Sequence, residues 1–349
     1  MRVAVVGATG VVGRAILDVM AERSFPAEEV VAFASARSAG QEVPYGPAAG
    51  GRTLRVEELR EDALDGFDLA LFSAGGSTSE EWAPRFVGRG AVVVDNSSYW
   101  RMFDDVPLVV AEVNPGALAG APRGIVANPN CSTMQMVVAL KPIVDAAGIE
   151  RIVVSTYQSV SGTGKAAVDE LTEQTRAYVR GDAFPAPEVY PHQIAFNVLP
   201  QVETFKAGDD YTTEERKMMD ETRKILGRED IGISATCARV PVYHGHSESV
   251  NVQTHADMSP EECREVLHEA PGVVVVDDPW QGLYPLATAV AGRDEVLVGR
   301  IRRDPSHDRS LNLWVVGDNL RKGAATNAVQ VAELLVKRGL VGERQPRAA

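Results

Sequence analysis

The stretch VAVVGATGVVGRAIL, residues 3–17, constrains the fold of this chain more than any other segment. An apolar run typical of a buried strand leads into glycines at positions 7, 10 and 13, and a helical pattern follows. Glycines at this spacing permit a tight turn and a close backbone approach to a pyrophosphate at the helix N-terminus. The alternative is a glycine-rich turn without a ligand. We favour the dinucleotide site, with contacts at Gly7, Thr9, Gly10, Val11, Val12 and Gly13.

The end of the second predicted strand indicates which dinucleotide to expect. NAD sites carry an acidic residue there, about 20 residues beyond the glycines, for the ribose hydroxyls. This chain instead has Ser35, Arg37 and Ser38, and no carboxylate. A guanidinium and two hydroxyls suit a 2′-phosphate, so we predict NADP(H). The alternative is that Arg37 is an ordinary solvated arginine.

The first half of the chain alternates short apolar strands with helical patterns. Strands are predicted over residues 2–6, 29–34, 69–73, 91–95 and 125–127, with helices over 12–22 and 78–88. Alternation of this kind is typical of parallel sheets, because each helical crossover returns the chain to the same edge. We therefore expect an α/β domain with a Rossmann-like, doubly wound parallel sheet.

The second half has a different character. Strands are predicted over 151–160, 238–243, 249–255 and 311–316, and helices over 164–181, 213–227 and 259–270. We expect an α+β domain with a mixed sheet, and a last helix, 324–338, that packs back on the first domain. A length of 349 residues also favours two domains. We assign 1–130 with 325–349 to the dinucleotide domain and 131–324 to a catalytic and dimerisation domain.

Charge and cysteine content exclude several classes of protein. The net charge is −13, so nucleic acid and anionic membranes are not expected partners. No apolar run approaches the roughly 20 residues of a membrane span, and the N-terminus lacks a signal-peptide pattern. Cys131, Cys237 and Cys263 are far apart and form no CxxC pair. We therefore expect a cytoplasmic protein without disulfides.

The motif NPNCST, residues 128–133, places a cysteine between a short apolar strand and a long helical run. If the helix begins just after Asn130, Cys131 lies in its first turn, where the positive end of the helix dipole favours a thiolate. Asn130 can cap that helix and donate toward a substrate oxyanion. Pro142 is expected to kink or interrupt the helix. From these residues alone, a buried structural cysteine remains an alternative to a nucleophile.

The segment CARVPVYHGHSESV, residues 237–250, offers partners for a nucleophilic cysteine. In the predicted strand, alternation puts Arg239, Pro241 and Tyr243 on one side. His244 and His246 are then expected beyond the strand, at a glycine-containing turn. A His-x-His pair can bind a metal, but no further cluster completes such a site, so no metal is predicted.

These motifs, in this order, resemble the bacterial aspartate-semialdehyde dehydrogenase family. The matching segments are VGATGVVG, DNSSYWR, NPNCST, YQSVSGTG, EERKMMDETRKIL and CARVPVYHGHSESV, and they cover nearly the whole chain. The resemblance implies a glyceraldehyde-phosphate-dehydrogenase-like architecture and a homodimer or a dimer of dimers. It also implies NADPH-dependent conversion of aspartyl 4-phosphate to aspartate semialdehyde and inorganic phosphate, in lysine, diaminopimelate, threonine and methionine biosynthesis.

The resemblance further implies roles for single residues. Cys131 would form the acyl thioester, His246 would serve as general acid/base and Gln158 would orient the substrate. Arg239 would hold the substrate α-carboxylate through a bidentate guanidinium. The remaining expected contacts are Arg101 and Lys217 for the phosphoryl group, Glu215 for the amine, and Ser161, Gly162 and Asn319 for the cofactor.

Alternative functions remain at this point. N-acetyl-gamma-glutamyl-phosphate reductase performs the same chemistry on a different acyl phosphate, although NPNCST and EERKMMDETRKIL argue against it. Glyceraldehyde-phosphate dehydrogenase shares the architecture but not these motifs. A non-catalytic homologue with a binding role would be expected to lose the nucleophile or its partners, whereas this chain keeps Cys131, Gln158, Arg239 and His246.

Overall fold

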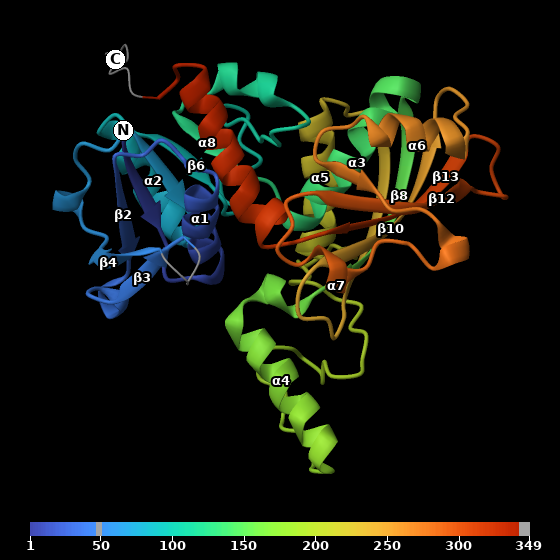
Figure 1. Cartoon of the computed structure of the whole chain (residues 1–349), viewed down its shortest axis with the longest axis horizontal. Coiled ribbons are helices and arrows are strands. Elements are labelled where there is room, and N and C mark those ends of the chain that lie inside the picture. Colours follow the sequence, from blue (N-terminus) through green and yellow to red (C-terminus); the bar gives the residue numbers. More distant parts are fainter. Residues whose placement is uncertain (47–50, 342–349) are drawn as a thin grey trace. The chain divides into compact units, whose positions relative to one another are not determined.

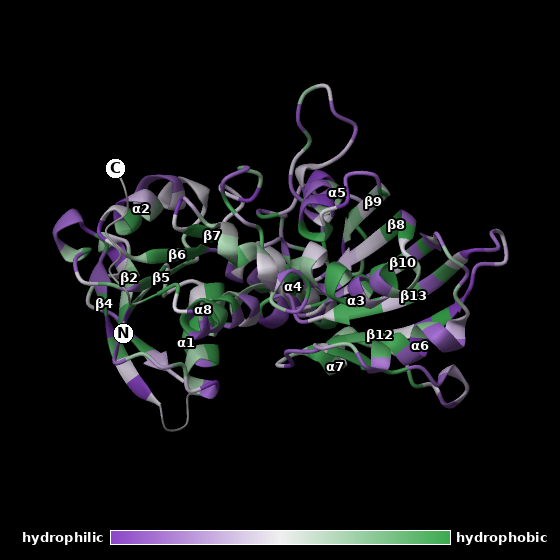
Figure 2. Cartoon of the chain, turned by 90° about the horizontal axis from the view of Figure 1, so that it is seen from above, coloured by the Kyte–Doolittle hydropathy of each residue, from purple (hydrophilic) through white to green (hydrophobic). Residues whose placement is uncertain are grey.

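The computed structural model describes residues 1–46 and 51–341. The chain divides into two units, which are described separately. The N-terminal unit comprises Met1–Asn130 and Ala324–Ala349, and the central unit comprises Cys131–Gly323. Figure 1 labels their elements, and Figure 2 shows hydrophobic residues concentrated on the strands of both units and on α8 (Asn327–Lys337).

The described part of the N-terminal unit contains a seven-stranded sheet in the order β3-β4-β2-β1-β5-β6-β7. All pairs are parallel except β3 with β4, which confirms the predicted doubly wound sheet. The central strands are buried and read as continuous apolar runs, as expected when helices cover both faces. The elements are β1 (Arg2–Val6), α1 (Val11–Glu22), β2 (Glu29–Ala34), η1 (Ala36–Ser38), β3 (Glu42–Tyr45), β4 (Arg52–Glu58), η2 (Glu61–Ala63), β5 (Leu69–Phe72), α2 (Gly76–Gly88), β6 (Val92–Asp95), η3 (Pro115–Gly120) and β7 (Ile125–Ala127).

The last helix, α8, completes this unit. Its apolar side joins the core formed by α1 and the sheet, where Ala328, Val331 and Leu335 are buried. Arg23, which follows α1, donates to Glu333 of α8 at 2.7 and 2.9 Å. The C-terminal helix α8 therefore packs in the N-terminal unit, although the whole central unit lies between α8 and the rest of that unit in the sequence.

The central unit contains a six-stranded mixed sheet in the order β11-β12-β13-β10-β8-β9 within its described residues. The β8–β9 and β11–β12 pairs are parallel, and β10 is antiparallel to both of its neighbours. Helices α3, α5 and α6 pack on the sheet, whereas α4 extends away from it (Figure 1). The elements are α3 (Cys131–Ala147), β8 (Ile149–Gln158), η4 (Val160–Thr163), α4 (Lys165–Arg180), α5 (Thr213–Leu226), β9 (Gly232–Arg239), β10 (His246–Thr254), α6 (Pro260–His268), β11 (Val273–Val275), η5 (Pro279–Gln281), α7 (Ala287–Val290), β12 (Val296–Arg303) and β13 (Ser310–Gly317), followed by a π-helical turn, η6 (Arg321–Thr326).

Three expectations for the central unit differ from the structure. The strand predicted over 238–243 ends at Arg239, because the following Pro241 has no N–H for a ladder bond. His246 is not in a turn but is the first residue of β10. Helix α3 also continues through Pro142, since it is buried along most of its length and tertiary packing outweighs the local disruption.

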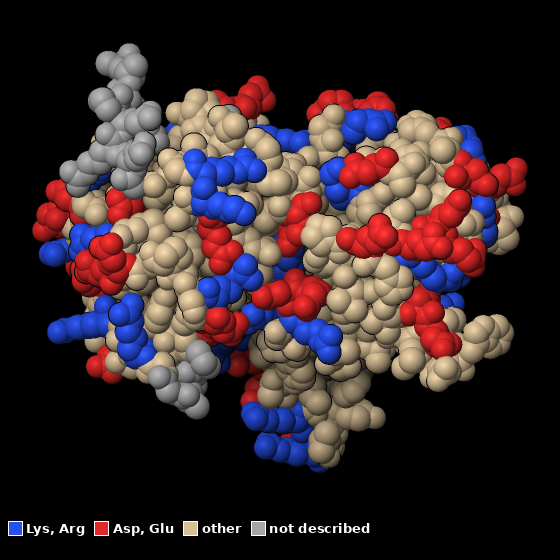
Figure 3. Space-filling model, turned by 45° about the horizontal axis from the view of Figure 1, so that its top comes forward, with Lys and Arg blue, Asp and Glu red and all other residues tan. Residues whose placement is uncertain are grey.

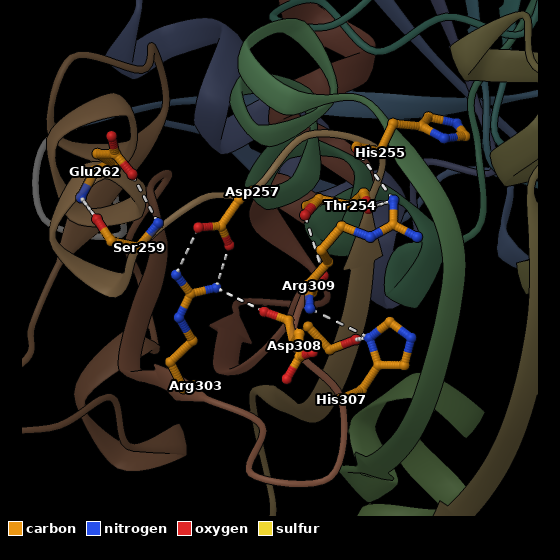
Figure 4. Close-up of polar contacts among 10 residues, drawn as sticks. Thr254, His255, Asp257, Ser259, Glu262, Arg303, His307, Asp308 and Arg309 are labelled. Atoms are coloured by element: carbon orange, nitrogen blue, oxygen red, sulfur yellow. Dashed lines mark hydrogen bonds and ion pairs between the residues drawn. The ribbon is translucent and has the colours of Figure 1, made fainter.

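The far end of the central sheet carries a group of polar residues that we call the distal cluster (Figure 4). Arg303 Nη1 and Nη2 donate to the two carboxylate oxygens of Asp257 at 2.7 and 3.2 Å, and Ser259 with Glu262 forms the capping box of α6. Arg309 donates to the backbone oxygens of Thr254 and His255 at 3.0 and 2.8 Å. The cluster, made of Thr254, His255, Asp257, Ser259, Glu262, Arg303, His307, Asp308, Arg309 and Ser310, joins β10, α6, β12 and β13.

Charged side chains of both signs are interspersed on the face shown in Figure 3. None of the described helices is both long and apolar enough to cross a membrane. All three cysteines are thiols.

Candidate active site

Cys131 is the first residue of α3, which confirms that the helix begins directly after Asn130. Its side chain is partly buried. A Cβ added at Gly323 would lie 2.8 Å from Cys131 Cβ, so the backbone at Gly323 packs against the cysteine. The helix N-terminus aims backbone N–H groups and the positive end of its dipole toward this position.

His246 is fully buried at the start of β10. Its Nδ1 lies 3.0 Å from the backbone N of Ser159 and 3.1 Å from the Ser159 hydroxyl. Its Nε2 contacts no hydrogen-bonding group among the described residues. Burial, together with the positive charge of Arg239, lowers the pKa of His246 well below its usual range. The ring is therefore neutral at physiological pH.

Arg239 ends β9 and is 5% exposed. Its Nη1 donates to the backbone oxygen of Ser159 at 2.7 Å. Gly162 covers this residue and His246: a Cβ there would lie 3.1 Å from Arg239 Nη1 and 3.2 Å from His246 Nε2. A side chain at position 162 would therefore crowd both polar groups, which gives Gly162 a packing role that the resemblance did not specify.

Gln158 ends β8, beside Arg239 in the register of β8 and β9. Its side chain is buried, and its Nε2 donates to Glu214 Oε1 at 3.0 Å. Lys217 lies on the same side of α5, with Nζ 3.5 Å from Glu214 Oε2 and in contact with Glu203. The structure thus joins Gln158, Glu214 and Lys217 in one polar group.

Glu215 does not belong to this group, contrary to its assignment to the substrate amine. It occupies the N3 position of α5, where Oε2 accepts from Thr212 N at 2.8 Å and Oε1 accepts from Cys237 N at 2.9 Å. Both carboxylate oxygens are held by backbone donors. Glu214, one residue earlier, is the carboxylate that meets Gln158. The Thr-x-x-Glu pattern of a capping box, residues 212–215, was the signal that could have separated the two.

Asn319 and the serines of the Q-S-V-S segment form a network around His246. Asn319 Oδ1 accepts from the hydroxyls of Ser159 and Ser161 at 3.1 and 3.2 Å, and from Gly245 N at 3.0 Å. Its Nδ2 donates to Ser161 Oγ at 3.0 Å. Ser161 and Asn319, expected to contact the cofactor, are thus buried and hydrogen-bonded to each other. Ser159 was not predicted, and its position directly after Gln158 was the available signal.

The N-terminal unit holds the remaining predicted substrate residues. Arg101 is 7% exposed, and its Nη2 donates to the backbone oxygen of Asn96 at 2.9 Å. Asn130 is also buried and directly precedes Cys131 in the chain. Their roles toward a phosphoryl group and an oxyanion stay predictions.

The glycine turn fits a dinucleotide. Gly7 has φ +86°, and a Cβ there would lie 2.2 Å from the Ser73 backbone oxygen, while a Cβ at Gly13 would lie 2.1 Å from Gly7 O. Gly10 caps α1 without a side chain, which leaves the helix N-terminus open to an anion. Thr9, Val11 and Val12 lie in the same turn, and Thr9 and Val12 are partly buried.

The second strand reaches the same end of the sheet. Gly7 N and Ala8 N donate to Phe33 O at 2.9 and 3.1 Å, so the end of β2 lies beside the glycine turn. Ser35, Arg37 and Ser38 follow in and before η1, and they are exposed except for the partly buried Ser38. No carboxylate occupies these positions, so the residues present suit a 2′-phosphorylated dinucleotide.

Two domain families match the chain. "Semialdehyde dehydrogenase, NAD binding domain" matches residues 2–121, and "Semialdehyde dehydrogenase, dimerisation domain" matches residues 140–322. Together with the parallel sheet, its glycine turn, the helix-terminal cysteine and the buried histidine, these matches define a dehydrogenase of the semialdehyde class.

Similar proteins narrow the class. The aspartate-semialdehyde dehydrogenase of Aquifex aeolicus is 57% identical over 97% of this chain and 99% of its own length. The aspartate-semialdehyde dehydrogenase of Legionella pneumophila is 51% identical over 98% of this chain and 97% of its own length. A crystal structure of aspartate semialdehyde dehydrogenase II from Vibrio cholerae has a TM-score of 0.92 at 48% identity, covering 96% of this chain and 98% of that chain. A second structure of that protein is described as complexed with ASA. The chain belongs to the aspartate-semialdehyde dehydrogenase family.

Proposed function

We propose that this protein catalyses NADPH-dependent reductive dephosphorylation of L-aspartyl 4-phosphate to L-aspartate 4-semialdehyde, releasing inorganic phosphate. Family membership supports the reaction. The observation that carries it is the buried Arg239–Gly162–His246 arrangement, in which the glycine backbone packs against a guanidinium and an imidazole. This reaction belongs to the route to lysine, diaminopimelate, threonine and methionine.

The reaction begins at Cys131. Its place at the N-terminus of α3 favours a thiolate, which attacks the acyl carbon of the phosphorylated substrate. The C–O bond to phosphate breaks with its electron pair on phosphate, and a thioester remains on Sγ. Backbone N–H groups at the helix start and the Asn130 amide would stabilise the oxyanion, at about 3 kcal/mol per donor in comparable sites.

The cofactor is the source of reducing equivalents: bound NADPH supplies a hydride to the thioester carbonyl. Gly7, Gly10 and Gly13 would hold its pyrophosphate at the start of α1, with Thr9, Val11 and Val12 lining the turn. Ser35, Arg37 and Ser38 would bind the 2′-phosphate. Support for NADP over NAD comes from the missing carboxylate at the end of β2.

Substrate recognition is assigned to charged groups of matching sign. Arg239 would bind the α-carboxylate through its fork, and Gln158 would orient the substrate beside Cys131. Lys217 and Arg101 would bind the phosphoryl group. For the substrate ammonium we assign Glu214 in place of Glu215, because Glu214 meets Gln158 while Glu215 caps α5. His246 is the acid–base group at the substrate oxygen, acting through Nε2.

We also propose a homodimer formed through the central unit, whose matched family is a dimerisation domain. The sheet has a partly exposed face, where the rings of Tyr157 and Trp314 lie 5.4 Å apart. Tyr178, Val179 and Phe196 are exposed hydrophobic residues on or near α4. A dimer of dimers would be a further assembly, and light scattering distinguishes the two. A cytoplasmic location is proposed because thiols persist in a reducing compartment.

The direct test is reduction of NADP by the purified protein with L-aspartate semialdehyde, with and without inorganic phosphate, beside Cys131→Ala. We expect phosphate-dependent activity in the wild type and loss of turnover in the variant, with cofactor binding retained. No activity in a folded wild-type protein would contradict the proposal. The N-acetylated glutamyl substrate is then the next to try, and failure of both leaves a non-catalytic binding role.

A further inference from the structure

Glu203 lies in the segment that leads into α5, and its carboxylate contacts Lys217, the residue that we assign to the phosphoryl group. Glu203 Oε1 accepts from Lys217 Nζ, and Oε2 accepts from the Thr213 hydroxyl at 2.6 Å. Thr213 is the first residue of α5, and Lys217 lies one turn further along on the same side of the helix. A carboxylate of the chain itself therefore holds the ammonium that we assign to an anionic ligand.

Lys217 is surrounded by more negative charge than it can balance. Besides Glu203, Glu214 contributes Oε2 at 3.5 Å from Lys217 Nζ. Two carboxylates and one ammonium leave this group with an excess of negative charge. A phosphoryl group adds further negative charge, and like charges at contact distance repel each other. The phosphoryl group can therefore bind Lys217 tightly only if one of the two carboxylates moves away.

Burial identifies Glu203 as the carboxylate that can move. The Glu214 side chain is 3% exposed, and its Oε1 accepts from Gln158 Nε2 at 3.0 Å, so it is held in the core. The Glu203 side chain is 41% exposed. Water can replace Lys217 as the partner of an exposed carboxylate at a small cost in free energy. Glu203 is thus the member of the group that an incoming anion can displace.

The backbone at Glu203 keeps the carboxylate within reach of Lys217. Glu203 has φ +62°, in the left-handed region that is uncommon for residues other than glycine. Gln201 Nε2 donates to the Glu203 backbone oxygen at 2.9 Å, and Thr213 N donates to Thr204 O at 2.9 Å. These bonds on either side fix the chain at an unusual conformation. The side chain can then leave Lys217 and return to it while the segment stays in place.

We propose that Glu203 competes with phosphate for Lys217. Its carboxylate holds the ammonium between turnovers, moves away when the phosphoryl group binds, and returns when inorganic phosphate leaves. This inference rests on the proposed function and concerns the phosphate part of that site, where Glu203 is a positioning residue that acts through Lys217. Phosphate binds only the fraction of molecules whose Lys217 has left Glu203, so its apparent affinity is reduced by that fraction. The reduced affinity assists release of phosphate after the thioester has formed.

The first test measures binding of inorganic phosphate to the full chain by titration calorimetry. Glu203→Gln removes the charge but keeps the size of the side chain and an oxygen for the Thr213 hydroxyl. We expect Kd for phosphate to fall about three- to fivefold at low salt, and by less at high ionic strength. Unchanged or weaker binding in the folded variant would overturn the proposal. Absence of phosphate binding in both proteins would overturn it as well.

Asp209→Asn is the matched control, because Asp209 lies in the same segment and pairs with the neighbouring cation of α5. Its two carboxylate oxygens accept from Arg216 Nε and Nη2 at 2.7 and 2.6 Å. This variant changes the net charge by the same amount but leaves Glu203 and Glu214 beside Lys217. Kd for phosphate should stay within about 1.5-fold of the wild-type value. Equal tightening in Asp209→Asn would show that general charge sets the affinity, and would contradict the proposal.

A double-mutant cycle with Lys217→Met tests whether Glu203 acts through Lys217. If the two residues form the competing pair, the tightening caused by Glu203→Gln should be lost when Lys217 is also replaced. The readout is again Kd for phosphate, measured for the wild type, both single variants and the double variant. Tightening of the same size with and without Lys217 would mean that the effect does not pass through the ammonium, and the competition would be refuted.

Steady-state kinetics separate this inference from the proposed function. With aspartate semialdehyde and NADP, Glu203→Gln should lower KM for phosphate about three- to fivefold and leave KM for the semialdehyde within about twofold. Equal changes in both KM values, or no change in either, would overturn the role of Glu203. If the wild type shows no activity with aspartate semialdehyde while Glu203→Gln still tightens phosphate binding, the substrate assignment fails and the competition at Lys217 stands.

Discussion

Two histidines at opposite ends of the central sheet, His246 and His307, each have an Nδ1 that faces a serine hydroxyl and a backbone N–H. At the near end His246 faces Ser159, and at the far end His307 faces the N–H of Arg309 and the hydroxyl of Ser310, at 3.3 and 3.0 Å. The local hydrogen bonds are alike, but His246 is fully buried and His307 is exposed. Burial, rather than the hydrogen-bond pattern, turns one pair into a candidate catalytic group.

The arginines of the two regions differ in the same way. Arg303 in the distal cluster pairs with Asp257, which is 68% exposed, and water screens both charges. Hydrogen bonds from Arg303 lower the pKa of Asp257. Arg239 is 5% exposed, and its Nε has no hydrogen-bond partner among the described residues. The buried Arg239 guanidinium has a donor that an anionic ligand could use, whereas the exposed Arg303 guanidinium already donates to Asp257.

Replacing each arginine by lysine gives the largest effect in this comparison. Arg239→Lys keeps the charge but loses the planar fork, and we expect kcat/KM for aspartate semialdehyde to fall about 100-fold. Arg303→Lys is the matched control, because it also loses a bidentate contact, and kcat/KM should stay within about twofold. Steady-state kinetics of both variants test the comparison. An unchanged kcat/KM in Arg239→Lys would remove Arg239 from the site.

Substitutions of three glutamates near helix N-termini should have smaller effects than Arg239→Lys, and each should change either KM or stability. These residues are Glu214, Glu215 and Glu262. Glu214→Gln should raise KM for the semialdehyde about tenfold, since a charged hydrogen bond to the ammonium is lost. Glu215→Ala should leave KM unchanged and lower the free energy of unfolding by about 1–2 kcal/mol, because two backbone N–H groups lose their acceptor.

Glu262→Ala removes the equivalent capping-box carboxylate of α6 in the distal cluster, and about 1 kcal/mol of stability should be lost there without any kinetic change. Urea denaturation and initial rates separate the three cases. If Glu215→Ala raised KM and Glu214→Gln did not, the original assignment from the sequence would be restored.

Much of the fold could be predicted because its strongest signals are local. The strands 2–6, 29–34 and 125–127 match the structure at both ends, since buried parallel strands read as unbroken apolar runs. The hairpin of β3 and β4 was missed because edge strands carry polar residues and, in β3, Pro44. Strands β11 and β12 were missed as well. The end of β9 was misplaced because apolar alternation continued past the proline that ends the strand.

The candidate site could be predicted in part for a related reason. Cys131, Gln158, Arg239 and His246 lie in motifs that a family resemblance locates, and three of them stand at the ends of neighbouring strands or at a strand start. Glu214 and Glu215 differ by one position, so only the three-dimensional partners of each carboxylate tell them apart. Ser159 contacts His246, which is 87 positions away, and spacing along the chain does not reveal such a contact.

The smallest expected effect concerns Glu248, a buried acid of β10 that can be compared with the exposed acids of the distal cluster. It is fully buried, and neither carboxyl oxygen has a hydrogen-bond partner among the described residues, in contrast to the exposed acids of the distal cluster. Because burial raises the pKa of Glu248, the folded protein keeps a proton that the unfolded chain releases above the ordinary glutamate pKa. Stability contributed by this group is therefore present at low pH and is lost as pH rises toward the folded pKa. Glu248→Gln removes that dependence while keeping the shape of the side chain.

The free energy of unfolding of Glu248→Gln relative to wild type should therefore rise by about 1.4 kcal/mol per pH unit from the ordinary glutamate pKa up to the raised pKa of the folded protein. Chemical denaturation of both proteins at one fixed concentration measures the difference, since an oligomer's stability depends on concentration. Glu262→Gln, at an exposed acid whose pKa is lowered by hydrogen bonds from Ser259, should show no such rise over this range. A constant difference between wild type and Glu248→Gln would mean that Glu248 is charged in the folded protein. A carboxylate would then face the neighbouring Glu214 in the core, and the assignment of a neutral Glu248 would have to be abandoned.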